Sequence, residues 1–150
     1  MSSTLLSPSP RTTRRGFTSP STYRVTAPAD DAAPRVAREF VRAILARDIP
    51  ALVDDARLCT SDAVTAVLRH TTGAYLHVDV SVLARRVVVS VGDSDRTGVL
   101  NRRDLRKETS GLSLVRRLSA ASGVSWSWDA HRRTVITRVW FTLETGLVSP

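Results

Sequence analysis

Apolar residues first recur every three or four positions along the chain, and this period predicts two consecutive helices. Pro34 suits the first turn of the first helix, which the sequence Asp48-Ile49-Pro50 ends. Its apolar face consists of Val36, Phe40, Val41, Ile44 and Leu45. The stripe of the second helix consists of Leu52, Ala56, Cys59, Ala63 and Val67. We expect this second helix to end near residues 71–73, with Gly73 just past its last turn.

Alternation of apolar and polar residues then replaces the helical period. Residues 74–83 alternate cleanly, which predicts a strand with one buried and one polar face. Residues 84–93 are more continuously apolar and predict a central strand, joined to the first through a tight turn at Ala84-Arg85. Residues 22–27 also alternate and predict a short edge strand before the first helix.

The C-terminal third begins with a polar segment, residues 94–110, that has no period. A loop of this length in a small domain is usually functional or mobile. An amphipathic helix is expected over 111–122, closed by Gly123, followed by strands over 124–128 and 134–144. The order β-α-α-β-β-loop-α-β-β predicts an α+β fold, a two-layer sandwich with helices on one face of a mostly antiparallel sheet.

The composition is that of one globular domain with short tails. The chain has 150 residues, of which 42% are hydrophobic and 24% charged. Residues 1–22 consist largely of Ser, Thr, Pro and Arg, so we expect a disordered basic tail, a domain over 23–146 and a second tail over 147–150. No apolar run approaches the roughly 20 residues of a membrane span. The single cysteine, Cys59, cannot form an internal disulfide, which fits a reducing cytoplasm.

The net charge of +8 comes almost wholly from arginine. A basic chain attracts phosphates on nucleotides, nucleic acids or membranes, although codon bias and solubility are the preferred explanation of the charge taken alone. Nucleic-acid binding ranks last, because the chain lacks a face of interleaved aromatic and basic residues. The aromatic residues near the C-terminus are instead expected in the core or on the sheet: Trp126, Trp128, Trp140 and Phe141.

Four local patterns, in this order and spacing, resemble the ATP-binding domains of the GHKL superfamily of gyrase, Hsp90 and histidine kinases. They are AREFVRAIL, DDARLCTSDAVTAVLRH, VVVSVGDSD, and SGLSLVRRLSAASGVSW with the terminal VWFTL. The chain is most similar to the small bacterial anti-sigma-factor serine kinases, over residues 23–144. The resemblance implies the Bergerat-type ATP-binding fold and ATP with Mg²⁺ as ligands.

In that branch the second helix usually reads Ser-Glu-Leu-Val-Thr-Asn-Ala-Val-Arg-His. Its Glu acts as a base or orients water, and its Asn coordinates magnesium. Asp62 stands at the Glu position and becomes the candidate catalytic residue, with a solvated acid as the equal alternative. Ala66 stands at the Asn position, and a methyl group offers no lone pair to Mg²⁺. The resemblance therefore implies no protein metal ligand at Ala66.

The resemblance also implies a set of nucleotide-binding residues. Asp93, after a buried strand, would accept a hydrogen bond from the adenine amine, or else close the strand as an Asx-turn. Ser110, Gly111 and Leu112 stand where relatives have a Gly-x-Gly-Leu run against the phosphates. Arg103 belongs to an arginine-rich lid that would either clamp phosphates or remain a solvated loop.

The leading hypothesis is therefore an ATP-binding regulator. By resemblance it would phosphorylate a serine on an antagonist protein, hold a sigma factor and pair as a homodimer. The alternative is a degenerate member that works through protein contacts without nucleotide turnover. This alternative is favoured by departures from the family's motifs at Ala66, Asp95 and Arg138, and by the single glycine where relatives have a Gly-x-Gly-Leu run.

Overall fold

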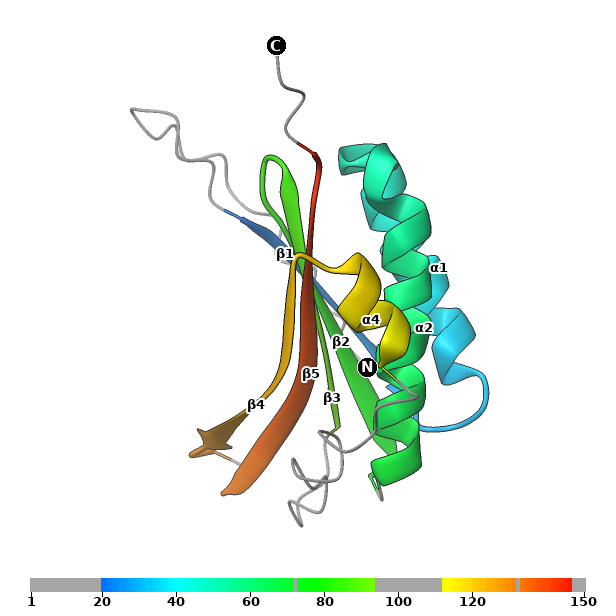
Figure 1. The fold of residues 1–150 in the computed structure, drawn as a ribbon. Helices are drawn as coiled ribbons and strands as arrows, with labels where there is room; N and C mark the ends of the chain where they lie inside the picture. The colour runs from blue at the N-terminus through cyan, green and yellow to red at the C-terminus, as the bar shows by residue number, and fades with distance from the viewer. Residues whose placement is uncertain (1–19, 72, 94–111, 132, 147–150) are drawn as a thin grey trace.

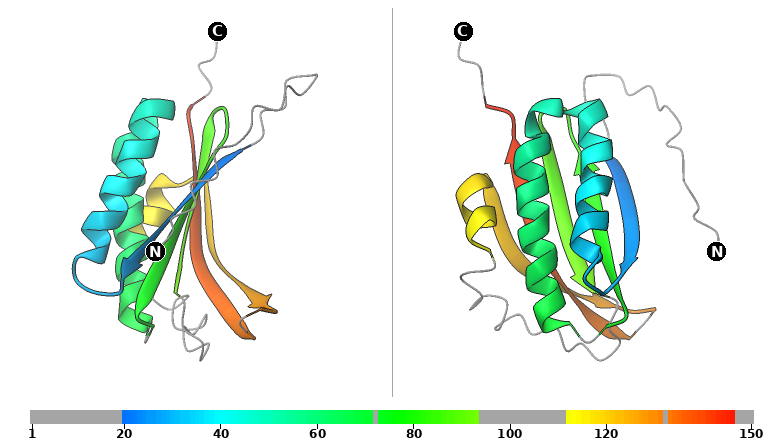
Figure 2. Two further views of the ribbon diagram at one scale, coloured as in Figure 1. Left: turned by 180° about the vertical axis from the view of Figure 1, so that it is seen from behind. Right: turned by 90° about the vertical axis from the view of Figure 1, so that its right-hand side faces the viewer.

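Two layers, a five-stranded sheet and a helical layer on one of its faces, make up the structure (Figure 1, Figure 2). It is a computed structural model that describes residues 20–71, 73–93, 112–131 and 133–146. The strand order is β1-β2-β3-β5-β4, and every pair of neighbours is antiparallel. The predicted α+β two-layer sandwich is confirmed.

The elements follow the predicted order along the chain. The strands are β1 (Ser21–Pro28), β2 (Tyr75–Val82), β3 (Arg86–Asp93), β4 (Ala121–Asp129) and β5 (Thr134–Glu144). The helices are α1 (Ala33–Asp48), the 3₁₀ turn η1 (Pro50–Leu52), α2 (Val53–His70) and α4 (Ser113–Leu118). β1 begins at Ser21, slightly before the expected start of the domain. Within the described ranges, none of the helices has the length and apolar character needed to cross a membrane.

The hydrophobic core lies between the sheet and helices α1 and α2. Proline stands in the first turn of α1, as predicted, and one face of the helix is buried. The helix-facing side of the sheet carries alternate apolar residues of three central strands. They are Leu76, Val78 and Val80 of β2, Val87, Val89 and Val91 of β3, and Val139, Phe141 and Leu143 of β5. The alternation that was predicted for β2 is therefore confirmed.

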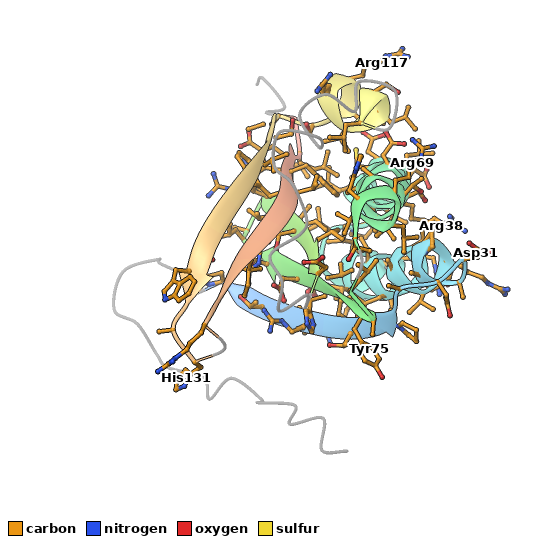
Figure 3. The ribbon with its side chains drawn as sticks, turned by 90° about the horizontal axis from the view of Figure 1, so that it is seen from below. Asp31, Arg38, Arg69, Tyr75, Arg117 and His131 are labelled. Atoms are coloured by element: carbon orange, nitrogen blue, oxygen red, sulfur yellow. The ribbon has the colours of Figure 1, made fainter. Side chains whose placement is uncertain are left out.

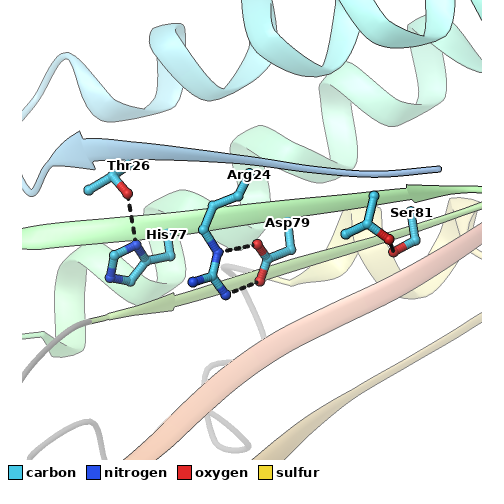
Figure 4. Close-up of polar contacts among 6 residues, drawn as sticks. Arg24, Thr26, His77, Asp79 and Ser81 are labelled. Atoms are coloured by element: carbon cyan, nitrogen blue, oxygen red, sulfur yellow. Dashed lines mark hydrogen bonds and ion pairs between the residues drawn. The ribbon is translucent and has the colours of Figure 1, made fainter. Parts of the chain in front are cut away.

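The opposite face of β1 and β2 carries a row of polar cross-strand pairs (Figure 4). Arg24 donates two hydrogen bonds to the carboxylate of Asp79, at 2.6 and 3.0 Å. Thr26 pairs with His77 at 3.0 Å. The hydrogen bond to Asp79 raises the pKa of Arg24, so this guanidinium stays charged. Pairs of this kind stabilise the register of a strand pair, each by up to about 1 kcal/mol.

The helix expected over 111–122 is shorter than predicted. α4 ends at Leu118, Ser119 adopts an extended conformation, and the Ala120 amide donates to the Thr142 carbonyl of β5. Residues 121–123 therefore belong to β4, because hydrogen bonding to the edge of the sheet outweighs one further helical turn. Gly123 does not close a helix. It faces Trp140 across the β4–β5 pair.

The Gly123–Trp140 pair yields a stability prediction. A β-carbon built on Gly123 would lie 3.0 Å from Cζ2 of the Trp140 ring. We expect Gly123→Val to lower the free energy of unfolding by about 1–3 kcal/mol, because the added methyl groups displace the indole. Gly146→Val is the matched control, since nothing lies within 4 Å of a β-carbon there. Equal midpoints of thermal unfolding for the two variants would contradict this account.

Candidate functional site

Asp62, the candidate catalytic residue, connects α2 to the first turn of α4. Its Oδ2 atom accepts a hydrogen bond from the Leu114 amide at 2.8 Å and lies 3.4 Å from the Val115 amide. Leu112, which precedes α4, contributes no side-chain cap of its own. Asp62 therefore supplies from another helix the acceptor that the first amides of a helix need. The carboxylate has a defined structural role, and its catalytic role stays a prediction.

Cys59 lies one turn before Asp62 and faces the same helix. Its thiol is fully buried, and Sγ lies 3.8 Å from the Leu114 carbonyl oxygen, to which it donates. Burial, together with the smaller effect of the charges of Asp55 and Asp62, raises the pKa of the Cys59 thiol to about 12. The thiol is consequently protonated at neutral pH, as befits a packing residue that also carries a weak donor.

Ala66, one turn after Asp62, does not fit the role of a magnesium ligand. Its side chain is an apolar methyl group and is 0% exposed. Mg²⁺ requires oxygen ligands and usually retains several waters, which need open space beside the ligand. Across the described ranges, no three His, Cys, Asp or Glu side chains are grouped so that they could hold a metal ion.

Asp93 ends β3 as a buried carboxylate, only 3% exposed. The Thr71 hydroxyl donates to its Oδ2 at 2.6 Å and accepts a hydrogen bond from the Gly73 amide at 2.9 Å. Thr71 is the first residue after α2 and has an extended backbone. The pair therefore joins the C-terminal end of α2 to the end of the central strand. A carboxylate can accept several hydrogen bonds, which is the property that an adenine contact requires.

Thr71 is the site residue that the sequence analysis missed. A threonine directly after a helix, with a glycine two residues on, is a usual arrangement for a side chain that bonds the following turn. That signal identifies the turn. It does not identify Asp93, which is 22 residues away in sequence and meets Thr71 only in the folded chain.

Asp62 belongs to α2, whereas Asp93, at the end of β3, reaches the C-terminal end of that helix through Thr71. Asp62 contacts α4, whereas Asp93 contacts Thr71, nine residues after Asp62. At 1.5 Å of rise per residue this separation is roughly 13 Å along the helix axis.

The other predicted nucleotide-binding residues are placed only in part. Leu112 is 5% exposed and lines a cavity of about 270 Å³ between α4 and the β4–β5 pair. Val124 and Trp140 line its opposite wall, and neither Asp62 nor Asp93 contributes to it. Arg103, Ser110 and Gly111 lie outside the described residues.

The aromatic residues divide between core and surface. Phe141 is fully buried, Trp140 covers Gly123, and Trp128 is 59% exposed near the end of β4. The side chain of Trp126 lies outside the described parts of the structure. Phe141 and Trp140 thus take the core and sheet-face positions that were expected of them.

The contact between Asp62 and α4 gives a second prediction. We expect Asp62→Ala to lower the free energy of unfolding by about 1 kcal/mol, because the amides of the first turn of α4 lose their acceptor. Asp62→Asn retains an acceptor oxygen and should lose clearly less. Urea unfolding of the two variants beside the parent chain measures the difference. An Asp62→Ala variant as stable as Asp62→Asn would contradict the capping role.

The burial of Ala66 gives a third prediction. Ala66→Asn places a polar amide in a fully packed position, so we expect a loss of about 1–3 kcal/mol in the absence of nucleotide. Ala46→Asn is the matched control, because Ala46 is exposed on α1 and the helix-propensity cost is the same. Thermal midpoints that fall equally in both variants would show that position 66 has room for the larger side chain.

Comparison with protein-family models and with curated proteins finds no match to this chain. The likeness to GHKL ATPases therefore rests on the residue patterns of the sequence. The structure shows an α+β two-layer sandwich, and the likeness to those ATPases stays a prediction.

Proposed function

We propose that this protein is an ATP-binding regulator resembling the anti-sigma-factor serine kinases, with impaired phosphoryl transfer. The observation that carries the proposal is the buried carboxylate of Asp93, which the Thr71 hydroxyl orients at the end of β3. The hydrogen bond from the Thr71 hydroxyl offsets part of the cost of burying this carboxylate. By resemblance, a carboxylate at this position would also accept a hydrogen bond from the adenine amine.

Two features support impaired transfer. Phosphoryl transfer depends on positioned groups and on charge neutralisation by a metal. Asp62 is already engaged by the amides of α4, and its shorter side chain reaches less far than a glutamate. Ala66 supplies no oxygen at the position that in relatives holds magnesium. We therefore propose binding of ATP, with Mg²⁺ held weakly and mainly by the phosphates.

A second candidate function is a protein-interaction module that binds no nucleotide. The specific observation in its favour is the Asp62–α4 contact. In relatives the start of the corresponding helix meets the phosphates, whereas here a carboxylate accepts from the amides of Leu114 and Val115. Anionic phosphates would have to compete with that carboxylate for the same region.

Under either function the protein would act through a protein partner. By resemblance the partner is a sigma factor or the antagonist that controls it, and the chain would pair as a homodimer. We further propose that this regulation takes place in the cytoplasm, where such partners reside.

The fourth prediction separates the two functions. Thermal unfolding is followed while ATP is added, with and without Mg²⁺. A ligand at roughly one hundred times its dissociation constant stabilises the native state by about 2.7 kcal/mol, so binding should raise the midpoint measurably. Asp93→Asn should abolish most of the rise, because an amide does not reproduce the carboxylate's acceptor pattern. Asp79→Asn on the open sheet face is the matched control.

ATP turnover is measured in the same samples, as release of ADP. We expect the parent chain to release ADP far more slowly than it binds ATP, and Asp62→Asn to change this little. A midpoint that stays flat at all ATP concentrations would exclude the ATP-binding function and leave the protein-interaction module. Rapid transfer to a serine substrate would contradict the proposed impairment.

A further inference from the structure

Three arginines, Arg35, Arg42 and Arg57, act on the charge of Glu39, and a fourth, Arg38, bonds Ser61 across the same two helices, α1 and α2. We call this surface the arginine face, and it consists of Arg35, Arg38, Glu39, Arg42 and Arg57. The two helices lie side by side over the sheet (Figure 2), and Arg38 lies on their outer side (Figure 3). These five residues carry four positive charges and one negative charge, and the exposed Asp54, one turn before Arg57 on α2, adds a second negative charge beside them.

Contacts within the arginine face hold it together across the two helices. Arg42 Nε donates to Glu39 Oε2 at 2.9 Å, within α1. Arg57, on α2, places Nη2 at 3.9 Å from Glu39 Oε1. Arg38 Nη1 donates to the Ser61 hydroxyl at 3.0 Å and so also bridges α1 to α2. Arg42 and Arg57 are thus both drawn towards Glu39, and Arg38 towards Ser61.

The single glutamate does not use the hydrogen-bonding capacity of its neighbours. A guanidinium group has five N–H donors, and Arg57 makes only one long contact to Glu39. Arg57 Nε is buried and, among the described residues, has no hydrogen-bond partner. The hydrogen bond from Arg42 lowers the pKa of Glu39, and the nearby arginine charges lower it further. Glu39 thus stays ionised, and the excess positive charge persists over the whole physiological pH range.

Exposed aliphatic side chains flank these charges. Val36 of α1 is 40% exposed and stands one turn before Glu39, while Leu58 of α2 is 47% exposed and follows Arg57 directly. They are two of the four large apolar residues that protrude from the described surface. A partner that fits this face needs acidic groups for the arginines and apolar groups for Val36 and Leu58.

We propose that the arginine face is the docking surface for an acidic amphipathic helix of a protein partner. This inference rests on the proposed function, in which the protein acts through a protein partner. Carboxylates of the incoming helix would meet Arg42 and Arg57, and its aliphatic residues would cover Val36 and Leu58. A nucleic acid fits less well, because its phosphates would meet the ionised Glu39 and leave both aliphatic residues without an apolar partner.

The experiment uses the full chain and a fluorescein-labelled synthetic peptide, a helix with glutamates and leucines on adjoining faces. Fluorescence anisotropy gives the dissociation constant at low ionic strength. We expect Arg42→Gln combined with Arg57→Gln to weaken binding by about tenfold. Arg47→Gln combined with Arg86→Gln removes the same charge outside the arginine face, and we expect its constant to stay within about twofold of the parent value. Circular dichroism establishes that both variants retain the parent's fold.

Leu58→Ser, which leaves the charges unchanged, should also weaken peptide binding, whereas a peptide with glutamines in place of glutamates should bind poorly. The proposal is overturned if the two double variants weaken binding equally, because net charge alone then accounts for it. It is also overturned if a random DNA duplex competes for the parent chain more tightly than the peptide. Neither result bears on the thermal response to ATP, so failure here and failure of the ATP-binding function are distinguishable.

Discussion

Helix α2 has to be covered by the sheet, by α1 and by α4 at the same time, and the rest of the structure depends on this constraint. Its buried side is wide, and its members are mostly small: Ala56, Cys59, Thr60, Ala63, Val64, Ala66 and Val67. Small side chains let three neighbours approach one helix closely, and such packing leaves little room for change at any buried position. This helix positions both acids of the candidate site, because it carries Asp62 and ends beside Thr71, which bonds Asp93.

The same constraint explains how the two acids of the site are held. A polar side chain beside packed surface is stabilised by hydrogen-bond donors within the protein, and this need is greatest for a carboxylate as buried as that of Asp93. Asp62 finds the amides of α4, and Asp93 finds the Thr71 hydroxyl. Each contact also fastens a neighbouring element to α2. The hydrogen bonds that position the two candidate site residues therefore also stabilise the fold. A substitution at either acid is expected to affect the stability of the fold as well as the candidate site.

The sequence predicted the fold where a periodic pattern was long, and it failed where tertiary pairing decided the outcome. The alternation of β2 and the stripe of α2 each extend over many residues, so their elements were identified correctly. The predicted end of α4 was wrong, because residues 121–123 pair with β5. No local sequence pattern indicates that pairing partner. The Thr71–Asp93 contact was missed for the same reason. The positions of Asp62 and Asp93 along α2 and β3 could be predicted, but their hydrogen-bond partners could not.

The alanine at position 66 has a consequence for stability as well as for chemistry. An asparagine at a fully buried position needs hydrogen-bond partners for its amide, and without them it would leave unsatisfied polar atoms in the packed interior. Ala66 is 0% exposed and has no polar side-chain atom, so it fills its position on α2 without any such partner. The contact of α2 with its neighbours at this position therefore depends on packing alone.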